Sequence, residues 1–142
     1  EGGTVGSLEP KLTVSGGIVS TAGITPDTRY PWGQCTWWAA TRRADIGKPI
    51  PGWGNAATWA GSAASAGYTV DGSPSAGSVI VFQPGVLGAS ADYGHVAMVE
   101  EVRGDGSILI SESNALGLGV VSTREISASQ LAAAGNGVRY IH

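Results

Sequence analysis

The chain has 142 residues and a net charge of −3, and 13% of its residues are charged against 42% hydrophobic. This length suits one domain with a real hydrophobic core. The acidic balance, without a basic run, argues against a nucleic-acid partner, and no apolar stretch approaches the ~18 residues that a membrane span needs. A single cysteine allows no internal disulfide, so stability must come from packing.

The first 29 residues differ from the rest of the chain. The pairs Gly2-Gly3 and Gly16-Gly17 and the turn-forming Thr25-Pro26-Asp27 interrupt short, weakly patterned pieces. We expect residues 1–29 to form a linker or an N-terminal arm of a larger protein, with at most short strands. The compact domain is expected over residues 30–142. The alternative, that the first segment is an ordinary part of the fold, stays open.

Two helices are predicted next. Residues 34–45 contain good helix formers and no breaker, and the helix should stop at Gly47 and Pro49. After a rigid loop of prolines and glycines, Asn55 is a good N-cap for a second helix over 56–66.

Beyond Gly67 the pattern changes to strands with one short helix. Strands are predicted at 68–70, 78–82, 95–102, 107–114, 120–126 and 138–141, and the helix at 127–134. The Asp-Gly pair at 105–106 lies between two apolar runs and predicts a tight hairpin. Helices first and an antiparallel sheet after them indicate an α+β domain.

The lone cysteine lies in Gly33-Gln34-Cys35-Thr36-Trp37-Trp38, at the start of the first predicted helix. The helix dipole and the free N–H groups at a helix N-terminus favour a thiolate. Cys35 is therefore a candidate nucleophile. The alternative is that it is a small buried hydrophobic residue, as most free cysteines are.

A catalytic thiol needs a base, and imidazole suits this role near neutral pH. His95 opens a predicted strand and is the better candidate, whereas His142 is the last residue and is expected to be a frayed terminus. The hairpin should bring Glu112 opposite a residue near Val99, with Asn114 nearer to His95 and on the same face as Glu112. Glu112 could then orient the base. A structural His95 and a solvent-facing Glu112 are the alternatives.

At these residues the chain resembles the CHAP domain, whose name abbreviates cysteine, histidine-dependent amidohydrolase/peptidase. The resemblance is carried, in the family's order, by Gly33-Gln34-Cys35-Thr36-Trp37-Trp38, Trp53-Gly54-Asn55-Ala56, Pro74-Ser75-Ala76-Gly77, Gly94-His95-Val96-Ala97 and Ile110-Ser111-Glu112-Ser113-Asn114. It implies a papain-like α+β fold, related to the NlpC/P60 hydrolases, with N-terminal helices packed on an antiparallel sheet. It also implies hydrolysis of peptidoglycan, either between glycan and stem peptide or within the peptide.

The resemblance assigns roles to individual residues. Cys35 matches the nucleophile, His95 the general base and Glu112 the third member, and Asn114 matches a polar residue often grouped with the site. Gln34 matches the residue whose amide is proposed to line the oxyanion hole with the Cys35 N–H, where fixed donors stabilise the developing charge.

Two tryptophans are candidate substrate contacts. Trp32 and Trp53 lie in loops beside Pro and Gly and flank Cys35 in the sequence. Loop tryptophans near a site can stack on a sugar face or line a groove. The alternative is that they cap the core.

No metal and no other cofactor is expected. Some phage members of the family carry an Asp-rich calcium site near the nucleophile, but here only Asp27 precedes Cys35. One cysteine and two histidines make no convincing zinc ligand set.

The sequence therefore predicts a peptidoglycan hydrolase, an amidase or an endopeptidase, with peptidoglycan as its partner and no nucleic acid. As an isolated domain it is expected to be a monomer. We expect it to be secreted, associated with the bacterial cell surface or wall, or carried on a phage particle. A non-catalytic wall-binding or structural module, and a cysteine peptidase acting on proteins, are the alternatives.

Overall fold

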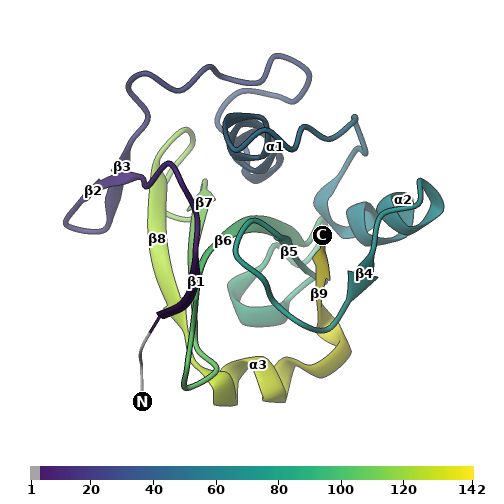
Figure 1. Cartoon of the computed structure of the whole chain (residues 1–142). Helices are drawn as coiled ribbons and strands as arrows, with labels where there is room; N and C mark the ends of the chain where they lie inside the picture. The colour runs from purple at the N-terminus through teal and green to yellow at the C-terminus, as the bar shows by residue number, and fades with distance from the viewer. Residues whose placement is uncertain (1–3) are drawn as a thin grey trace.

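The computed structural model describes residues 4–142, which form a single antiparallel sheet with helices packed on it (Figure 1). The elements in chain order are β1 (Thr4–Ser7), β2 (Thr13–Ser15), β3 (Ile18–Ser20), α1 (Cys35–Asp45), η1 (Ala56–Thr58), α2 (Trp59–Ser65), β4 (Val70–Asp71), β5 (Val79–Phe82), η2 (Val86–Gly88), β6 (His95–Arg103), β7 (Ile108–Ser113), β8 (Val121–Ile126), α3 (Ala128–Ala134), η3 (Gly135–Gly137) and β9 (Val138–Ile141). The predicted α+β class is confirmed.

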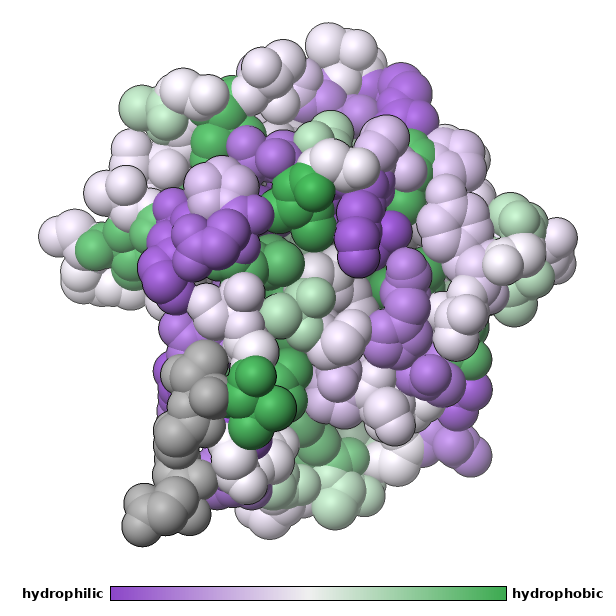
Figure 2. Space-filling model, in the orientation of Figure 1, coloured by the Kyte–Doolittle hydropathy of each residue, from purple (hydrophilic) through white to green (hydrophobic). Residues whose placement is uncertain are grey.

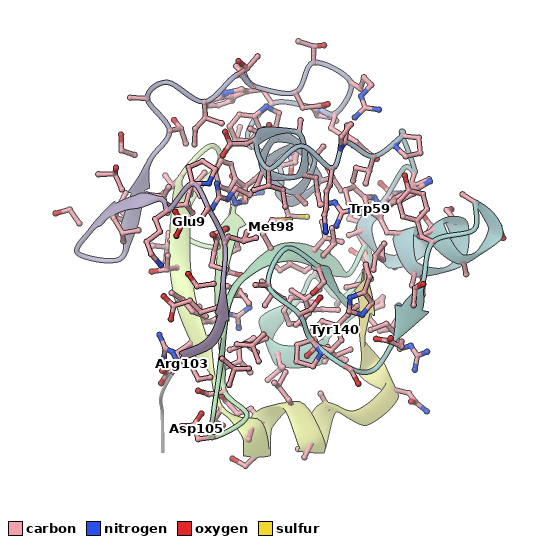
Figure 3. All side chains as sticks on the ribbon, viewed as in Figure 1. Glu9, Trp59, Met98, Arg103, Asp105 and Tyr140 are labelled. Carbon is pink, nitrogen blue, oxygen red and sulfur yellow. The ribbon has the colours of Figure 1, made fainter. Side chains whose placement is uncertain are left out.

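The sheet separates two hydrophobic layers. Its strand order is β2-β3-β8-β7-β6-β5-β9-β4, and β1 pairs with β6 outside this path. Side chains alternate between faces along β5, so Val79 and Val81 pack under α1 and α2, whereas Ile80 and Phe82 pack on the side of α3. In Figure 3, Met98 and Trp59 lie on the first side and Tyr140 on the second. Both faces of the central strands are covered, which explains the continuous apolar run at 78–82.

One face of the outer surface is mostly hydrophilic. On the face drawn in Figure 2, hydrophobic residues form small patches separated by hydrophilic ones. No helix among residues 4–142 is long and apolar enough to cross a membrane.

The N-terminal segment lies against the sheet. Strand β1 pairs with β6, and the β2–β3 hairpin joins β8 through Ile18 and Ser122. Leu8 and Val19 are buried. The described part of this segment thus contains only short strands and is held by main-chain pairing. Whether a domain boundary falls at residues 29 and 30 stays a prediction.

The helices differ from prediction in one respect. Helix α1 begins at Cys35, and Gln34 occupies the N-cap. The second predicted helix is not α-helical from its start: its first turn is the 3₁₀ turn η1, and the side chain of Asn55 makes no capping bond. In this turn Thr58 N–H donates to Asn55 O, the closer 3₁₀ spacing, and Ala57 N–H donates outside the turn to Tyr93 O.

His142 is not a frayed terminus, so that prediction was wrong. Its Nδ1 lies 2.8 Å from Ser75 Oγ and its Nε2 lies 2.8 Å from Asp71 Oδ1. Its backbone N–H donates to Thr69 O at 2.9 Å. The ring therefore holds β4 to the end of β9.

A buried ion pair connects α1 to the sheet. Arg42, on α1, is fully buried and donates from Nη2 and Nε to the carboxylate of Glu100 at 2.8 and 3.1 Å. Glu100 also accepts a bond from Ser111 Oγ on β7, and Trp38 Nε1 donates to the same hydroxyl. Arg42 Nη2 reaches Pro10 O of the N-terminal segment at 2.7 Å. One network thus holds α1, β6 and β7 together.

Removing one partner of this pair should strongly destabilise the fold. Glu100→Ala leaves the Nε and Nη2 groups of the buried Arg42 guanidinium without the Glu100 carboxylate, although Nη1 keeps its bond to Asp45, and this costs about 3–5 kcal/mol in the free energy of unfolding. Urea denaturation of the variant measures the loss. The matched control is Glu101→Ala, because Glu101 pairs with the partly exposed Arg103 and should cost less than about 1 kcal/mol. Equal losses in both variants would contradict this role for the buried pair.

Candidate active site

The turn before Cys35 is pinned by the β7–β8 loop. Gly33 has φ +83°, and a Cβ there would lie 2.7 Å from the backbone N of Gly119. The Gly33 carbonyl accepts bonds from Gly119 N–H at 3.0 Å and from Ser113 Oγ at 2.7 Å. Only glycine fits this close approach, and the contact holds the first residue of α1, the partly buried Cys35, at a defined position beside the sheet.

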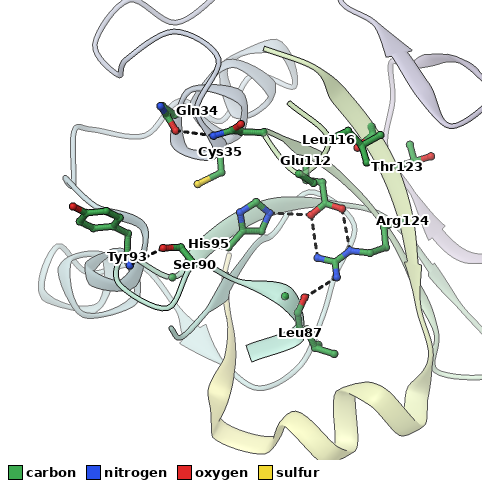
Figure 4. Close-up of a pocket in the computed structure, with 15 residues that line it drawn as sticks. Gln34, Cys35, Leu87, Ser90, Tyr93, His95, Glu112, Leu116, Thr123 and Arg124 are labelled. Carbon is green, nitrogen blue, oxygen red and sulfur yellow. Dashed lines mark hydrogen bonds and ion pairs between the residues drawn. The ribbon is translucent and has the colours of Figure 1, made fainter. Parts of the chain in front are cut away.

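His95 and Glu112 come together as predicted from the hairpin. His95 begins β6, and its Nε2 lies 2.9 Å from Glu112 Oε1 on β7. A β-bulge between Val99 and Glu101 sets Val99 opposite Ile110, so Glu112 lies further toward the His95 end than a residue facing Val99. Figure 4 shows the Cys35 side chain on the other side of the imidazole, facing the same pocket. The ring thus lies between the thiol and the carboxylate, with Nδ1 left for the thiol.

Arg124 is a site residue that the sequence reasoning missed. From β8, its Nε donates to Glu112 Oε2 at 2.9 Å and its Nη2 donates to Oε1 at 3.0 Å (Figure 4). A signal was present: β7 and β8 form a hairpin with Glu112 opposite Ser122, so Arg124 is a diagonal neighbour on the same face. Predicting this neighbour from the sequence requires the pairing register of β7 and β8. The connection between these strands contains no two-residue turn motif that would indicate the register.

The site favours a charged thiolate–imidazolium pair. Burial alone raises the pKa of the Cys35 thiol, but bonding to the His95 ring and to the N–H groups of Val96 and Thr36 outweighs it, and the thiol pKa falls below its usual value. Burial likewise lowers the pKa of His95, but its bonds to Cys35 and Glu112 raise it to about 9. At neutral pH the proton therefore lies on the imidazole.

The carboxylate of Glu112 remains ionised. Its side chain is only 3% exposed, and burial raises its pKa, yet the His95 bond and the Arg124 charge outweigh that effect and lower the pKa below the usual value. An ionised Glu112 can accept the Nε2–H bond and stabilise the charged ring.

Gln34 and Asn114 lie beside the thiol. Asn114 Nδ2 donates to Gln34 Oε1 at 3.1 Å. This bond occupies the amide oxygen of Gln34 and leaves its NH₂ group available as a donor. Asn114 has φ +65°, a left-handed conformation that asparagine tolerates at the end of β7.

A cleft runs across Cys35. One part is a cavity of about 560 Å³ that contains His95, Glu112 and Arg124. A second part of about 470 Å³ lies on the other side, toward Tyr30 and Asn55. The two parts share Gln34, Cys35, Tyr93 and Gly94. The thiol therefore lies between the two cavities. A substrate can place one part in each cavity while the thiol attacks the bond between the two parts.

The two candidate tryptophans are not brought to this cleft. Trp53 packs edge-on against Trp59 and Tyr68, with ring centroids at 5.5 and 5.2 Å. Trp32 is 62% exposed and packs on Trp37 and Gly119. Neither is among the residues that line the two cavities beside Cys35. Their contact with substrate stays a prediction.

Within residues 4–142, histidine, cysteine and acidic side chains do not gather in groups of three or more that could hold a metal ion. The expectation of a metal-free site is not tested by this observation and stays a prediction.

The family follows from comparison with known proteins. A profile of the CHAP domain matches residues 25–114, more than half of the chain. The chain belongs to the CHAP domain family.

Two similar proteins come from Staphylococcus aureus. The chain is 46% identical over 114 residues to the probable autolysin SsaALP of Staphylococcus aureus strain NCTC 8325, covering 80% of this chain and 40% of that protein. It is 40% identical over 147 residues to the N-acetylmuramoyl-L-alanine amidase sle1 of strain MRSA252, covering 93% of this chain and 41% of the relative. The chain thus spans less than half the length of these curated relatives.

Solved structures agree with this placement. The crystal structure of an N-acetylmuramoyl-L-alanine amidase from Staphylococcus aureus superposes with a TM-score of 0.74 at 41% identity, covering 81% of this chain and 31% of the other. The crystal structure of Ly7917 superposes with a TM-score of 0.54 at 24% identity, covering 77% and 52%, and shares the fold.

Thiol reactivity against pH should report the ion pair. The rate of Cys35 alkylation by iodoacetamide, followed by mass spectrometry, should rise at a pH below that of an ordinary thiol. In His95→Ala the transition should move to higher pH, because burial still raises the thiol pKa and the His95 bond and charge, which oppose burial most, are gone. His142→Ala is the matched control and should leave the curve unchanged. A wild-type curve that matches a free thiol would contradict the ion pair.

Proposed function

We propose that this domain hydrolyses an amide bond of peptidoglycan with Cys35 as nucleophile. The observation that carries the proposal is the array of Cys35, His95 and Glu112 in one cleft. In this array the pKa of the thiol is lowered and the pKa of the imidazole is raised. Membership of the CHAP domain family and the wall-directed names of similar proteins support the choice of substrate.

In the first half of the reaction the Cys35 thiolate attacks the amide carbonyl carbon and the carbonyl electrons move to oxygen. The Gln34 NH₂ group and the Cys35 N–H, which has no partner within the helix, donate to that oxyanion. The C–N bond then breaks, and the imidazolium of His95 gives its proton to the leaving amine. The products are a free amine and a thioester on Cys35.

In the second half, neutral His95 removes a proton from a water molecule, and the resulting hydroxide attacks the thioester carbonyl. The C–S bond breaks, the acid is released, and thiolate and imidazolium are restored. Glu112 holds the ring throughout and stabilises its charged form. The net change is the addition of one water molecule to the amide.

The position of His95 gives the cleft a direction. His95 lies in the larger cavity and not in the one beside Tyr30 and Asn55. Since the leaving amine takes its proton from His95, we place the amine part of the substrate in the larger cavity and the acyl part beside Tyr30.

The finer assignment is N-acetylmuramoyl-L-alanine amidase activity, since relatives of 40% identity or more carry that name. On this assignment the acyl part is the muramoyl group and the amine part is the stem peptide. Action on the wall implies a location outside the membrane, at the bacterial surface or secreted.

Digestion of purified Staphylococcus aureus peptidoglycan, read by mass spectrometry of the soluble products, tests the proposal. Wild type should release fragments, and Cys35→Ala and His95→Ala should release none. Glu112→Ala should keep a reduced rate, because it orients the base and takes no part in bond formation.

His142→Ala is the matched control and should behave as wild type, because His142 lies outside the cleft. Free stem peptide among the products would support the amidase, and cut peptide the endopeptidase. Full activity in Cys35→Ala would end the proposed mechanism. If folded wild type releases no peptidoglycan fragments, a wall-binding module is favoured. If it releases peptides from casein and nothing from peptidoglycan, a peptidase acting on proteins is favoured.

A further inference from the structure

Arg124 contacts three parts of the active-site region at once. Its Nε and Nη2 groups donate to the two oxygens of Glu112, and its Nη1 donates to the carbonyl of Leu87 at 2.8 Å. Its guanidinium lies over the ring of Phe82, 5.5 Å from the centroid. Although 35% of the side chain is exposed, the planar group is thus held by a paired carboxylate, a backbone carbonyl and an aromatic face.

The first contact restricts the orienting carboxylate. A carboxylate that accepts one bond from His95 could rotate about its side-chain bonds and still keep that contact. Here Arg124 binds both oxygens, and Oε1 is shared between Arg124 Nη2 and His95 Nε2. The fork therefore selects one carboxylate plane, and with it the direction in which the imidazole points.

The second contact reaches the wall of the cleft. Leu87 has φ +51° and ψ +39°, a left-handed conformation that a leucine rarely adopts. Leu87 and Gly88 line the larger cavity together with His95. The Nη1 bond to the Leu87 carbonyl thus connects this strained turn to the orienting carboxylate through the Arg124 guanidinium (Figure 4).

We propose that Arg124 is a positioning residue of the hydrolytic site, which fixes the Glu112 carboxylate plane behind His95 and holds the Leu87 turn against the same cleft. This inference rests on the proposed hydrolase function. Arg124 touches neither the thiol nor the imidazole, and it acts through Glu112.

The chemistry of the contacts requires arginine. Three donors of one rigid plane point to Glu112 Oε2, Glu112 Oε1 and the Leu87 carbonyl. The ammonium group of a lysine is a compact charge on a flexible stem and cannot reproduce that fork. Arg124→Lys therefore keeps the charge and loses the geometry, whereas Arg124→Met loses both.

The first measurement is steady-state hydrolysis of soluble peptidoglycan fragments from a glycosidase digest. Arg124→Met should lower kcat by about 10- to 100-fold and leave KM within about 2-fold, the usual loss when an outer partner of a catalytic group is removed. The kcat of Arg124→Lys should lie between those of wild type and Arg124→Met, about 3- to 10-fold below wild type. The matched control is Arg103→Met, since Arg103 pairs with Glu101 and Glu125 outside the cleft and its loss should leave kcat unchanged.

A double-mutant cycle separates positioning from mere stability. If Arg124 acts through Glu112, Arg124→Met should add less than about 2-fold to the loss caused by Glu112→Gln alone. If Arg124 acts independently of Glu112, the two losses should multiply, and if it only supports the fold, Arg124→Met should lose no activity per folded molecule; either result overturns the proposal. All rates are scaled to the folded fraction from thermal unfolding. Should Arg124→Met fail to fold, full kcat in Arg124→Lys would overturn the proposal, and the stated loss would support it.

The outcomes also separate this inference from the function on which it rests. Wild type that releases no fragments, with an ordinary thiol in the alkylation assay, overturns both. Active wild type with a His95-dependent thiol and no coupling between positions 112 and 124 overturns this inference alone.

Discussion

The buried pair of Arg42 and Glu100 is the interaction on which the site depends. Arg42 belongs to α1, Glu100 to β6, and Ser111 on β7 bonds the same carboxylate. These are the three elements that carry the candidate nucleophile, base and orienting acid. A buried pair contributes little net stability over an apolar substitute, but it enforces one arrangement, because any slip leaves a charge unpaired. The pair therefore sets how α1 lies over the sheet, and so where the thiol meets the imidazole.

The site itself is a row of alternating charges. In order they are the Cys35 thiolate, the His95 imidazolium, the Glu112 carboxylate and the Arg124 guanidinium, and Glu112 bonds both to His95 and to Arg124. Partial burial strengthens every attraction in the row, because water screens it less. Burial is the largest single effect on the pKa of Cys35, His95 and Glu112, and because the signs alternate, the attraction between neighbouring groups outweighs that desolvation penalty. The last member faces solvent most, where a permanent charge costs least.

Several features were predictable because they depend on local chemistry. The start of α1 near Cys35 and the hairpin at the Asp-Gly pair follow from helix propensity and turn rules. The structure adds Arg124, and it overturns the frayed terminus predicted for His142. Both depend on contacts between residues far apart in the chain, which no local pattern encodes. The 3₁₀ geometry of the first turn after Asn55 was missed as well, and there Ala57 N–H bonds to the distant Tyr93 O.

By itself the sequence determined the α+β class, the family resemblance and the identity of the Cys–His–Glu candidates, because these depend on residue types, their order and short-range periodicity. Only the tertiary structure decided which nitrogen of His95 meets Glu112, that Arg124 closes the row, and that Trp53 packs against the core aromatic residues. The physical reason is strand pairing. A one-residue bulge at Glu100 shifts which residues face each other, and the bonds of the site exist only in the resulting register.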